Sequence, residues 1–266
     1  MIIDMHVHCF PDKFAPRSIS ARSQKFGIIP KSDGTIKGVE VSMSKACVNI
    51  SVLQPIALKP VQTVKMNRWA ADIKNDGITS FGTIHPDYPD WKHEIKWLAA
   101  EGFKGIKFHA DCQGYFVDDP HMLSIYQAVF DAGLIILFHS GVDLAFTEPF
   151  HCTPSKLRKV LDTFPGAIMI AAHMGGYRYW DDVEKYLLGR DIYFDTAYSI
   201  HEMGLERAEK FIKQHGTDKI LFGTDFPWRD HATDISLIKS LDFAHEDINK
   251  ILGNNAKKLL GLDDVK

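Results

Sequence analysis

The stretch IIDMHVH, residues 2–8, decides the fold because an apolar run leads directly into two histidines spaced two residues apart. On an extended strand such side chains point the same way, so His6 and His8 can bind one metal ion together. The Phe-Pro-Asp sequence at residues 10–12 breaks the pattern and predicts that the pair lies at the carboxyl end of a short buried strand. In a parallel barrel that end carries the chemistry. An isolated His-x-His pair is equally typical of packed or exposed histidines, so the rest of the chain must decide.

The composition is that of a globular protein with a sizeable core. The 266 residues are 45% hydrophobic and 24% charged, with a formal net charge of −3 and four scattered cysteines that suit reduced thiols. The charge balance argues against nucleic acid or a membrane surface as the main partner, and no apolar run approaches the ~20 residues that span a bilayer. Without signal-peptide features at the start, we expect a cytoplasmic protein with a small-molecule substrate. A homo-oligomer is left open.

Strand and helix patterns alternate along the whole chain. The predicted strands cover residues 2–8, 46–56, 78–85, 103–109, 134–139, 167–173, 192–195 and 219–224. Eight strands alternating with helices, without a break in composition, predict an α/β fold: a single (β/α)8 TIM barrel domain over residues 1–266. A doubly wound sheet is the runner-up, and it is weaker because no glycine-rich phosphate loop follows the first strand.

Residues 9–45 form a long segment with weak periodicity. We expect a loop or lid insertion there. Long loops in compact domains tend to be functional, so one reading is a cover over the metal, and the other is a solvated surface excursion.

Three further predicted strands end in a polar group directly after an apolar run, at His139, His173 and Asp225. A single histidine in such a position is usually structural. Because the carboxyl ends of the strands of a parallel barrel form one face, all three side chains are expected to share a site with His6 and His8.

The order of these motifs resembles the amidohydrolase superfamily, in the branch that includes aminocarboxymuconate-semialdehyde decarboxylase and resorcylate-type decarboxylases. The matching pieces are IDMHVH at 3–8, GFKGIKFH at 102–109, FHSG at 138–141, AHMGG at 172–176, LFGTDFP at 221–227 and ILGNNA at 251–256. The resemblance implies that one divalent metal ion is bound by His6, His8, His139 and Asp225. It also implies that His173 lies beside the metal-bound water and moves protons.

This ligand set has a clear chemical use. Three neutral imidazoles and one carboxylate leave the ion with net positive charge and an open position, so a bound water ionises near neutral pH. His173 can then take or give the proton, while Asp225 binds metal, accepts a proton from the water, or does both. The ligands suit Zn²⁺ best, and Mn²⁺, Fe²⁺ and Ni²⁺ also fit.

Lys107 and His109 have the same parity on the fourth strand and should both face inward. Binuclear members of the superfamily carry a carboxylated lysine on this strand, but the branch resembled here is mononuclear. The other roles for Lys107 are lining the barrel or contacting a substrate carboxylate. His109 stands where the family often has His-Pro, but Ala110 follows it, so supporting, substrate-facing and packing roles are all open.

Two loop arginines are candidates for substrate binding. Arg178 and Arg229 can hold a carboxylate bidentately, and their alternative role is that of plain surface arginines. Trp228 can wall an aromatic pocket or simply pack.

Together these residues predict a mononuclear metal-dependent hydrolase that acts on a small carboxylate-bearing or cyclic substrate through a metal-activated water. The alternative is a non-oxidative decarboxylase of an aromatic or unsaturated carboxylic acid, and the core motifs do not separate the two. A non-catalytic metal- or ligand-binding barrel is a weaker reading, because a structural site would need neither His173 as a proton shuttle nor a solvent-facing Asp225.

Overall fold

A computed structural model describes residues 1–262 of the chain. It divides into two compact units. The first comprises Met1–Leu53, Asn75–Thr79 and the described residues from Asp195 onward, and the second comprises Gln54–Lys74 and Ser80–Phe194. Among the described residues, no helix combines the length and apolarity that a membrane crossing requires.

The first unit is built around strand β1 (Ile3–Val7), which is buried along its whole length. On one side it pairs in parallel with β2 (Ile50–Leu53), and Ser51 of β2 in turn donates its N–H to the carbonyl of Gly77, next to β3 (Ile78–Ser80). On the other side it runs beside β9 (Ile220–Leu221) and the residues that follow, through a bond from the Met5 N–H to the Phe222 carbonyl of 2.8 Å. With a neighbouring chain segment on each edge, β1 is an inner strand of the sheet, and all of its residues are buried.

Two helices occupy the segment that was expected to be a loop: α1 (Ala15–Phe26) and α2 (Ile36–Ala46). The prediction of a long loop over residues 9–45 is therefore wrong. Helix α1 buries only Ala15 and Ile19, so its apolar stripe is too thin to give a clear period. The start of α2 is fixed by Thr35, whose hydroxyl accepts the N–H of Gly38 at 3.0 Å. Whether this segment covers a site stays a prediction.

The rest of the first unit is helical. Its elements are α9 (Ile200–Met203), α10 (Leu205–His215), η2 (Thr217–Lys219), α11 (His231–Lys239), α12 (His245–Asn249), the π-helical η3 (Lys250–Asn254) and α13 (Asn255–Leu260). Asn255 donates to the carbonyls of Thr217 and Ile220 at 2.7 and 2.8 Å, so it ties the last helix to the start of β9.

The second unit contains a parallel sheet in the order β4-β5-β6-β7-β8. The strands are β4 (Gly82–Thr83), β5 (Gly105–Phe108), β6 (Ile135–Phe138), β7 (Met169–Ala171) and β8 (Tyr193–Asp195), whose last residue belongs to the first unit. Phe108, Phe138 and Ala171 stand side by side in register at the ends of their strands. The residues that follow them are therefore brought to one edge of the sheet.

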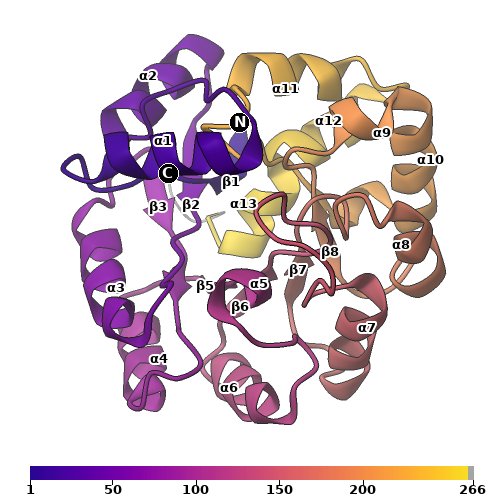
Figure 1. Ribbon diagram of the computed structural model, residues 1–266. Helices are drawn as coiled ribbons and strands as arrows, with labels where there is room; N and C mark the ends of the chain where they lie inside the picture. The colour runs from indigo at the N-terminus through magenta and orange to yellow at the C-terminus, as the bar shows by residue number, and fades with distance from the viewer. Residues whose placement is uncertain (263–266) are drawn as a thin grey trace. The chain divides into compact units, whose positions relative to one another are not determined.

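Helices separate these strands in sequence, which is the predicted alternation. They are η1 (Pro60–Gln62), α3 (Thr63–Asp72), α4 (Trp91–Ala100), the short α5 (Ala110–Gln113), α6 (Pro120–Asp131), α7 (Pro154–Thr163) and α8 (Trp180–Tyr186). Within this unit α4, α6 and α7 lie outside strands β5 to β7 (Figure 1). Strands β5 and β6 are shorter than predicted because each ends directly before a histidine, His109 and His139. The short helices α5 and α9 were not expected.

Candidate metal centre

The first unit brings three of the predicted ligands together: His6, His8 and Asp225. Their potential ligand atoms all lie within 4.8 Å of one another. His6 Nε2 is 3.6 Å and His8 Nε2 is 3.2 Å from the same carboxylate oxygen, Oδ1 of Asp225. Ligand atoms at about 2.1 Å from a tetrahedral ion stand about 3.4 Å apart, and the two distances fall on either side of this value. This donor set therefore fits a divalent metal ion.

The backbone explains this convergence. His6 lies in β1 and His8 directly follows the strand, with the two ring centroids 5.1 Å apart. Backbone hydrogen bonds join this segment to the chain around Asp225. The Asp225 N–H donates to the His6 carbonyl at 2.8 Å, and the His8 N–H donates to the Phe226 carbonyl at 2.6 Å. These two bonds fix the register between the histidine pair and the carboxylate.

Asp4 adds a second connection between the same two segments. Its carboxylate is fully buried and accepts the N–H of His6 at 2.9 Å and the N–H of Thr224 at 3.1 Å, as well as the Thr224 hydroxyl. His231 Nε2 lies 3.2 Å from the other Asp4 oxygen, and Nδ1 of the same ring is hydrogen-bonded to Ser42 on α2. Asp4 thus anchors the backbone on both sides of the candidate metal ligands.

His6 has a further buried partner that sequence reasoning did not single out. Its Nδ1 lies 2.7 Å from Oδ2 of Asp195, and the two side chains are 1% and 0% exposed. The signal for Asp195 was present, since this residue ends an apolar strand just as Asp225 follows one.

The second unit gathers three histidines at the ends of neighbouring strands: His109, His139 and His173. All three are buried. His139 Nδ1 and His173 Nε2 are 3.1 Å apart, at hydrogen-bond distance. The rings of His109 and His139 are stacked with centroids 4.0 Å apart and planes inclined by 5°. His109 thus lies beside the other strand-end histidines, and its role stays a prediction.

His109 is held by a buried carboxylate that no motif indicated. Its Nε2 lies 3.0 Å from Oδ2 of Asp143, four residues beyond His139. Burial opposes the charged form of His109, but Cys112 and the Asp143 carboxylate favour it, and the balance raises the pKa of His109 to about 10. Burial likewise opposes ionisation of Asp143, and its bond to His109 lowers the pKa of Asp143 overall. Its bond to Asp143 and its stacking on His139 together hold the His109 ring in a fixed orientation at the strand ends.

Three candidate site residues share an unusual backbone. His173, Arg178 and Asp225 have φ of 61°, 59° and 65°, all in the left-handed region that non-glycine residues rarely adopt. Such conformations are concentrated at functional sites.

The remaining candidates differ in setting. Lys107 is 1% exposed on β5, where every residue is buried, while Arg178 is exposed and stands 5.0 Å from the ring of Tyr177. Arg229 donates its Nε–H to Asp234 at 2.7 Å. The buried Trp228 makes an edge-to-face contact with Phe26 of α1, with ring centroids 5.0 Å apart. These contacts favour structural roles for Arg229 and Trp228.

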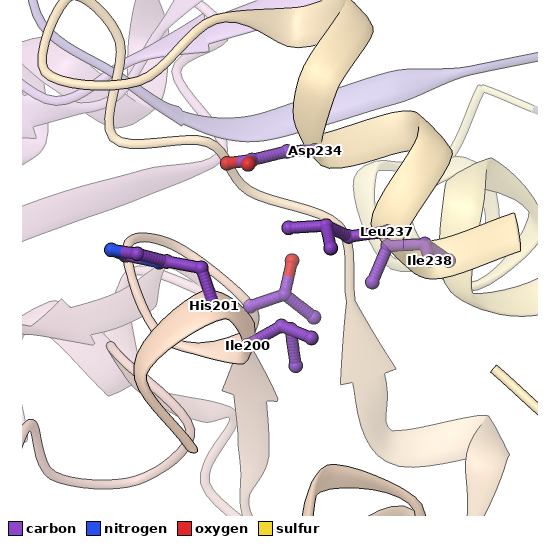
Figure 2. Close-up of a pocket in the computed structure, with 6 residues that line it drawn as sticks. Ile200, His201, Asp234, Leu237 and Ile238 are labelled. Carbon is purple, nitrogen blue, oxygen red and sulfur yellow. The ribbon is translucent and has the colours of Figure 1, made fainter. Parts of the chain in front are cut away.

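A small pocket in the first unit lies between α9 and α11 (Figure 2), lined by Thr196, Ile200, His201, Asp234, Leu237 and Ile238. It has room for about one water molecule. Burial raises the pKa of Asp234 to about 6, although the Arg229 guanidinium opposes this shift. The pocket contains no predicted ligand and is too small for an organic substrate.

A family model described as amidohydrolase matches residues 3–262. The chain belongs to the amidohydrolase family. Membership confirms the family predicted from the motifs, and with it a metal-dependent enzyme, either a hydrolase or a decarboxylase. No curated protein matches the sequence.

Solved structures resemble this amidohydrolase over nearly its whole length. The 5-carboxyvanillate decarboxylase of Sphingomonas paucimobilis aligns with a TM-score of 0.74 and 15% identity over 98% of each chain. An uncharacterized Tim-barrel protein of Bordetella bronchiseptica aligns with a TM-score of 0.72 and 16% identity, also over 98% of each chain. A dihydroxybenzoic acid decarboxylase of a Polaromonas species, with bound manganese and the inhibitor 2-nitroresorcinol, aligns with a TM-score of 0.69 and 14% identity over 98% of this chain and 97% of that one. The likeness confirms the predicted fold class, an α/β chain of the (β/α)8 TIM barrel type.

Proposed function

We propose that this amidohydrolase is a metal-dependent, non-oxidative decarboxylase of an aromatic carboxylic acid. The observation that carries the proposal is its full-length likeness to decarboxylases of carboxyvanillate and dihydroxybenzoate. Hydrolysis, the first reading of the sequence, has support only from the family as a whole. The alternative reading, decarboxylation, is therefore the better one.

We propose one divalent ion per chain, bound by the four residues that the sequence motifs indicate: His6, His8, His139 and Asp225. The distances within the first unit support His6, His8 and Asp225 as ligands. His139 is buried at a strand end of the second unit, beside His173 and His109. Zn²⁺ suits these ligands, and Mn²⁺ is present in the Polaromonas structure, so both ions belong in the tests.

A bound divalent ion supplies a Lewis acid that neutralises negative charge on substrate oxygens. The protein itself supplies the proton. We assign this role to His173, which gives its proton to the ring carbon that carries the carboxylate. The bond to the carboxyl carbon then breaks, its electron pair restores the aromatic ring, and CO₂ leaves. A proton from water returns His173 to its starting state, while Asp225 holds the ion and can accept a proton from water.

The substrate carboxylate needs a positive partner. Arg229 already uses its Nε–H on Asp234, whereas Arg178 is exposed. We therefore favour Arg178 over Arg229 for this contact, with the buried Lys107 as the second candidate. We also propose that the enzyme works in the cytoplasm on a small molecule, with neither nucleic acid nor a membrane as a partner.

The test is a substrate screen of the purified chain loaded with Zn²⁺ or with Mn²⁺. Hydroxybenzoates, carboxyvanillate and non-aromatic acids are offered beside lactones and amides, and CO₂ release is followed together with the ultraviolet spectrum of the aromatic ring. In D₂O the product should carry one deuterium at the carbon that lost CO₂. Chelated protein and His173→Asn serve as controls and should release CO₂ far more slowly.

Turnover of lactones or amides with no CO₂ from any aromatic acid would establish hydrolysis and refute the proposal. Release of CO₂ at the same rate from chelated protein would contradict the role of the metal.

A further inference from the structure

The pair formed by His6 and Asp195 is buried more completely than the other contacts of the candidate ligands in the first unit. The carboxylate Oδ2 of Asp195 stands 2.7 Å from His6 Nδ1, and both side chains are closed to solvent. The other oxygen, Oδ1, accepts the N–H of Ala197 at 3.2 Å, which fixes the direction of the carboxylate. His8 and Asp225, by comparison, are 18% and 15% exposed.

The chemistry of this contact determines where the His6 proton lies. An ionised carboxylate only accepts hydrogen bonds, so at 2.7 Å the Nδ1 of His6 must carry hydrogen. In the neutral ring the lone pair is then on Nε2. Nε2 is the atom that lies 3.6 Å from Asp225 Oδ1, on the side where the three ligand atoms converge.

We propose that Asp195 is a positioning residue of the metal centre. Its carboxylate holds His6 as the Nδ1–H tautomer, directs Nε2 to the ion and raises the affinity for metal. The inference rests on the proposed function in that His6 is taken as a metal ligand. It adds a residue from β8 that is outside the four proposed ligands.

A merely structural Asp195 would cap the turn at Ala197 and leave the His6 proton where it is. Two measurements separate the roles. Ring ¹⁵N spectra of the metal-free protein report the tautomer of His6, with its signals assigned by their loss in His6→Gln. Competition with a chromogenic chelator gives the dissociation constants for Zn²⁺ and Mn²⁺.

Asp195→Ala should lower metal affinity by about 10- to 100-fold and let His6 populate the Nε2–H tautomer. Asp195→Asn should lower metal affinity less, because its amide oxygen can still accept the Nδ1–H of His6. This variant also replaces Asp195→Ala in the measurements if the alanine variant does not fold. Asp218→Asn is the matched control, since Asp218 is an exposed carboxylate of the same unit that pairs with Lys250. It should bind metal like the wild type.

Wild-type metal affinity in Asp195→Ala, or an unchanged Nδ1–H tautomer, would overturn the inference. The outcome is independent of catalysis. If Asp195→Ala weakens metal binding while no acid is decarboxylated, the positioning role stands and the proposed function fails. If acids are decarboxylated and Asp195→Ala binds metal normally, the proposed function stands and the positioning role fails.

Discussion

Replacing Asp4 by Ala should lower the free energy of unfolding of the metal-free protein by about 3–7 kcal/mol. Asp4 is fully buried, and its carboxylate accepts the N–H groups of His6 and Thr224. Each N–H left buried without an acceptor costs about 1–3 kcal/mol, and the lost bond from the Thr224 hydroxyl adds about 1 kcal/mol. The loss falls on the junction between β1 and the chain leading to Asp225, so metal affinity should fall as well.

Urea unfolding in the presence of a chelator measures this change, with fluorescence and circular dichroism recorded together to verify a single transition. Asp4→Asn is the matched control, because its amide oxygen can keep both N–H bonds, and it should cost less than half as much. Thr224→Val removes the hydroxyl bond to Asp4 and also leaves the Phe226 N–H without its acceptor, so it should cost about 2–4 kcal/mol. A stability of Asp4→Ala within 1 kcal/mol of the wild type would refute the anchoring role of Asp4.

Four further predictions concern the metal, the proton shuttle and pH. Replacing any one of the four proposed ligands by alanine should lower the metal content of the purified protein, which elemental analysis measures; the ligands are His6, His8, His139 and Asp225. Full metal occupancy in three of the four variants would refute the assignment. His173→Ala should keep its metal but lose about 10²- to 10⁴-fold in turnover, whereas loss of metal would make His173 a ligand. Lys107→Ala should leave about one metal per chain, and a wild-type ratio near two would favour a carboxylated bridge. Burial opposes ionisation of Asp118, but hydrogen bonds from Lys159 and Lys156 lower the pKa of Asp118 overall. The ionised carboxylate therefore stabilises the fold above its unfolded pKa of about 4. This stabilisation is lost as the pH falls through the pKa of Asp118 in the folded protein. Asp118→Asn should therefore lower the thermal midpoint at pH 7 but not at pH 2, and an equal loss at both would contradict the ion-pair origin.

The strands were predictable because each is a short apolar run that ends in a break. β6, with the sequence IILF, is buried at every position and is followed at once by His139. A parallel strand covered on both faces must be apolar throughout, so its first polar residue marks the edge where strand ends meet. The same rule predicted His173 and Asp225 as strand-end residues, and the family motifs then predicted which side chains bind the metal and which one carries the proton.

The carboxylates behind the histidines were not predictable in the same way. Asp195 lies 189 positions from His6 along the chain, and nothing local to either residue specifies the partner. Asp143 stands in a loop after His139, where no hydrophobic period applies. A strand period shows which way a side chain points, whereas a hydrogen bond needs the distance between two segments, and only the folded chain provides it.

The helices between residues 9 and 45 illustrate a different limit. Helix α1 exposes most of its surface and reaches the core with two small or medium side chains, Ala15 and Ile19. Its N-terminal Pro16 suits a first turn, and Gly27 ends it at φ 68°. These start and stop signals were readable, but without a broad apolar stripe they were not combined into a helix.

The backbone at His173 and Asp225 fits the proposal that these side chains take part in the chemistry. A left-handed conformation costs a non-glycine residue roughly 1–2 kcal/mol, and glycine would adopt it freely. Glycine is in fact used for the same purpose two residues after His173, where Gly175 has φ 85°. Asp225 is held in place by its N–H bond to the His6 carbonyl, so the strain is balanced by the contact that also sets the ligand geometry. A carboxylate and an imidazole at two positions that suit glycine are what the proposal expects, because it assigns metal binding to Asp225 and proton transfer to His173.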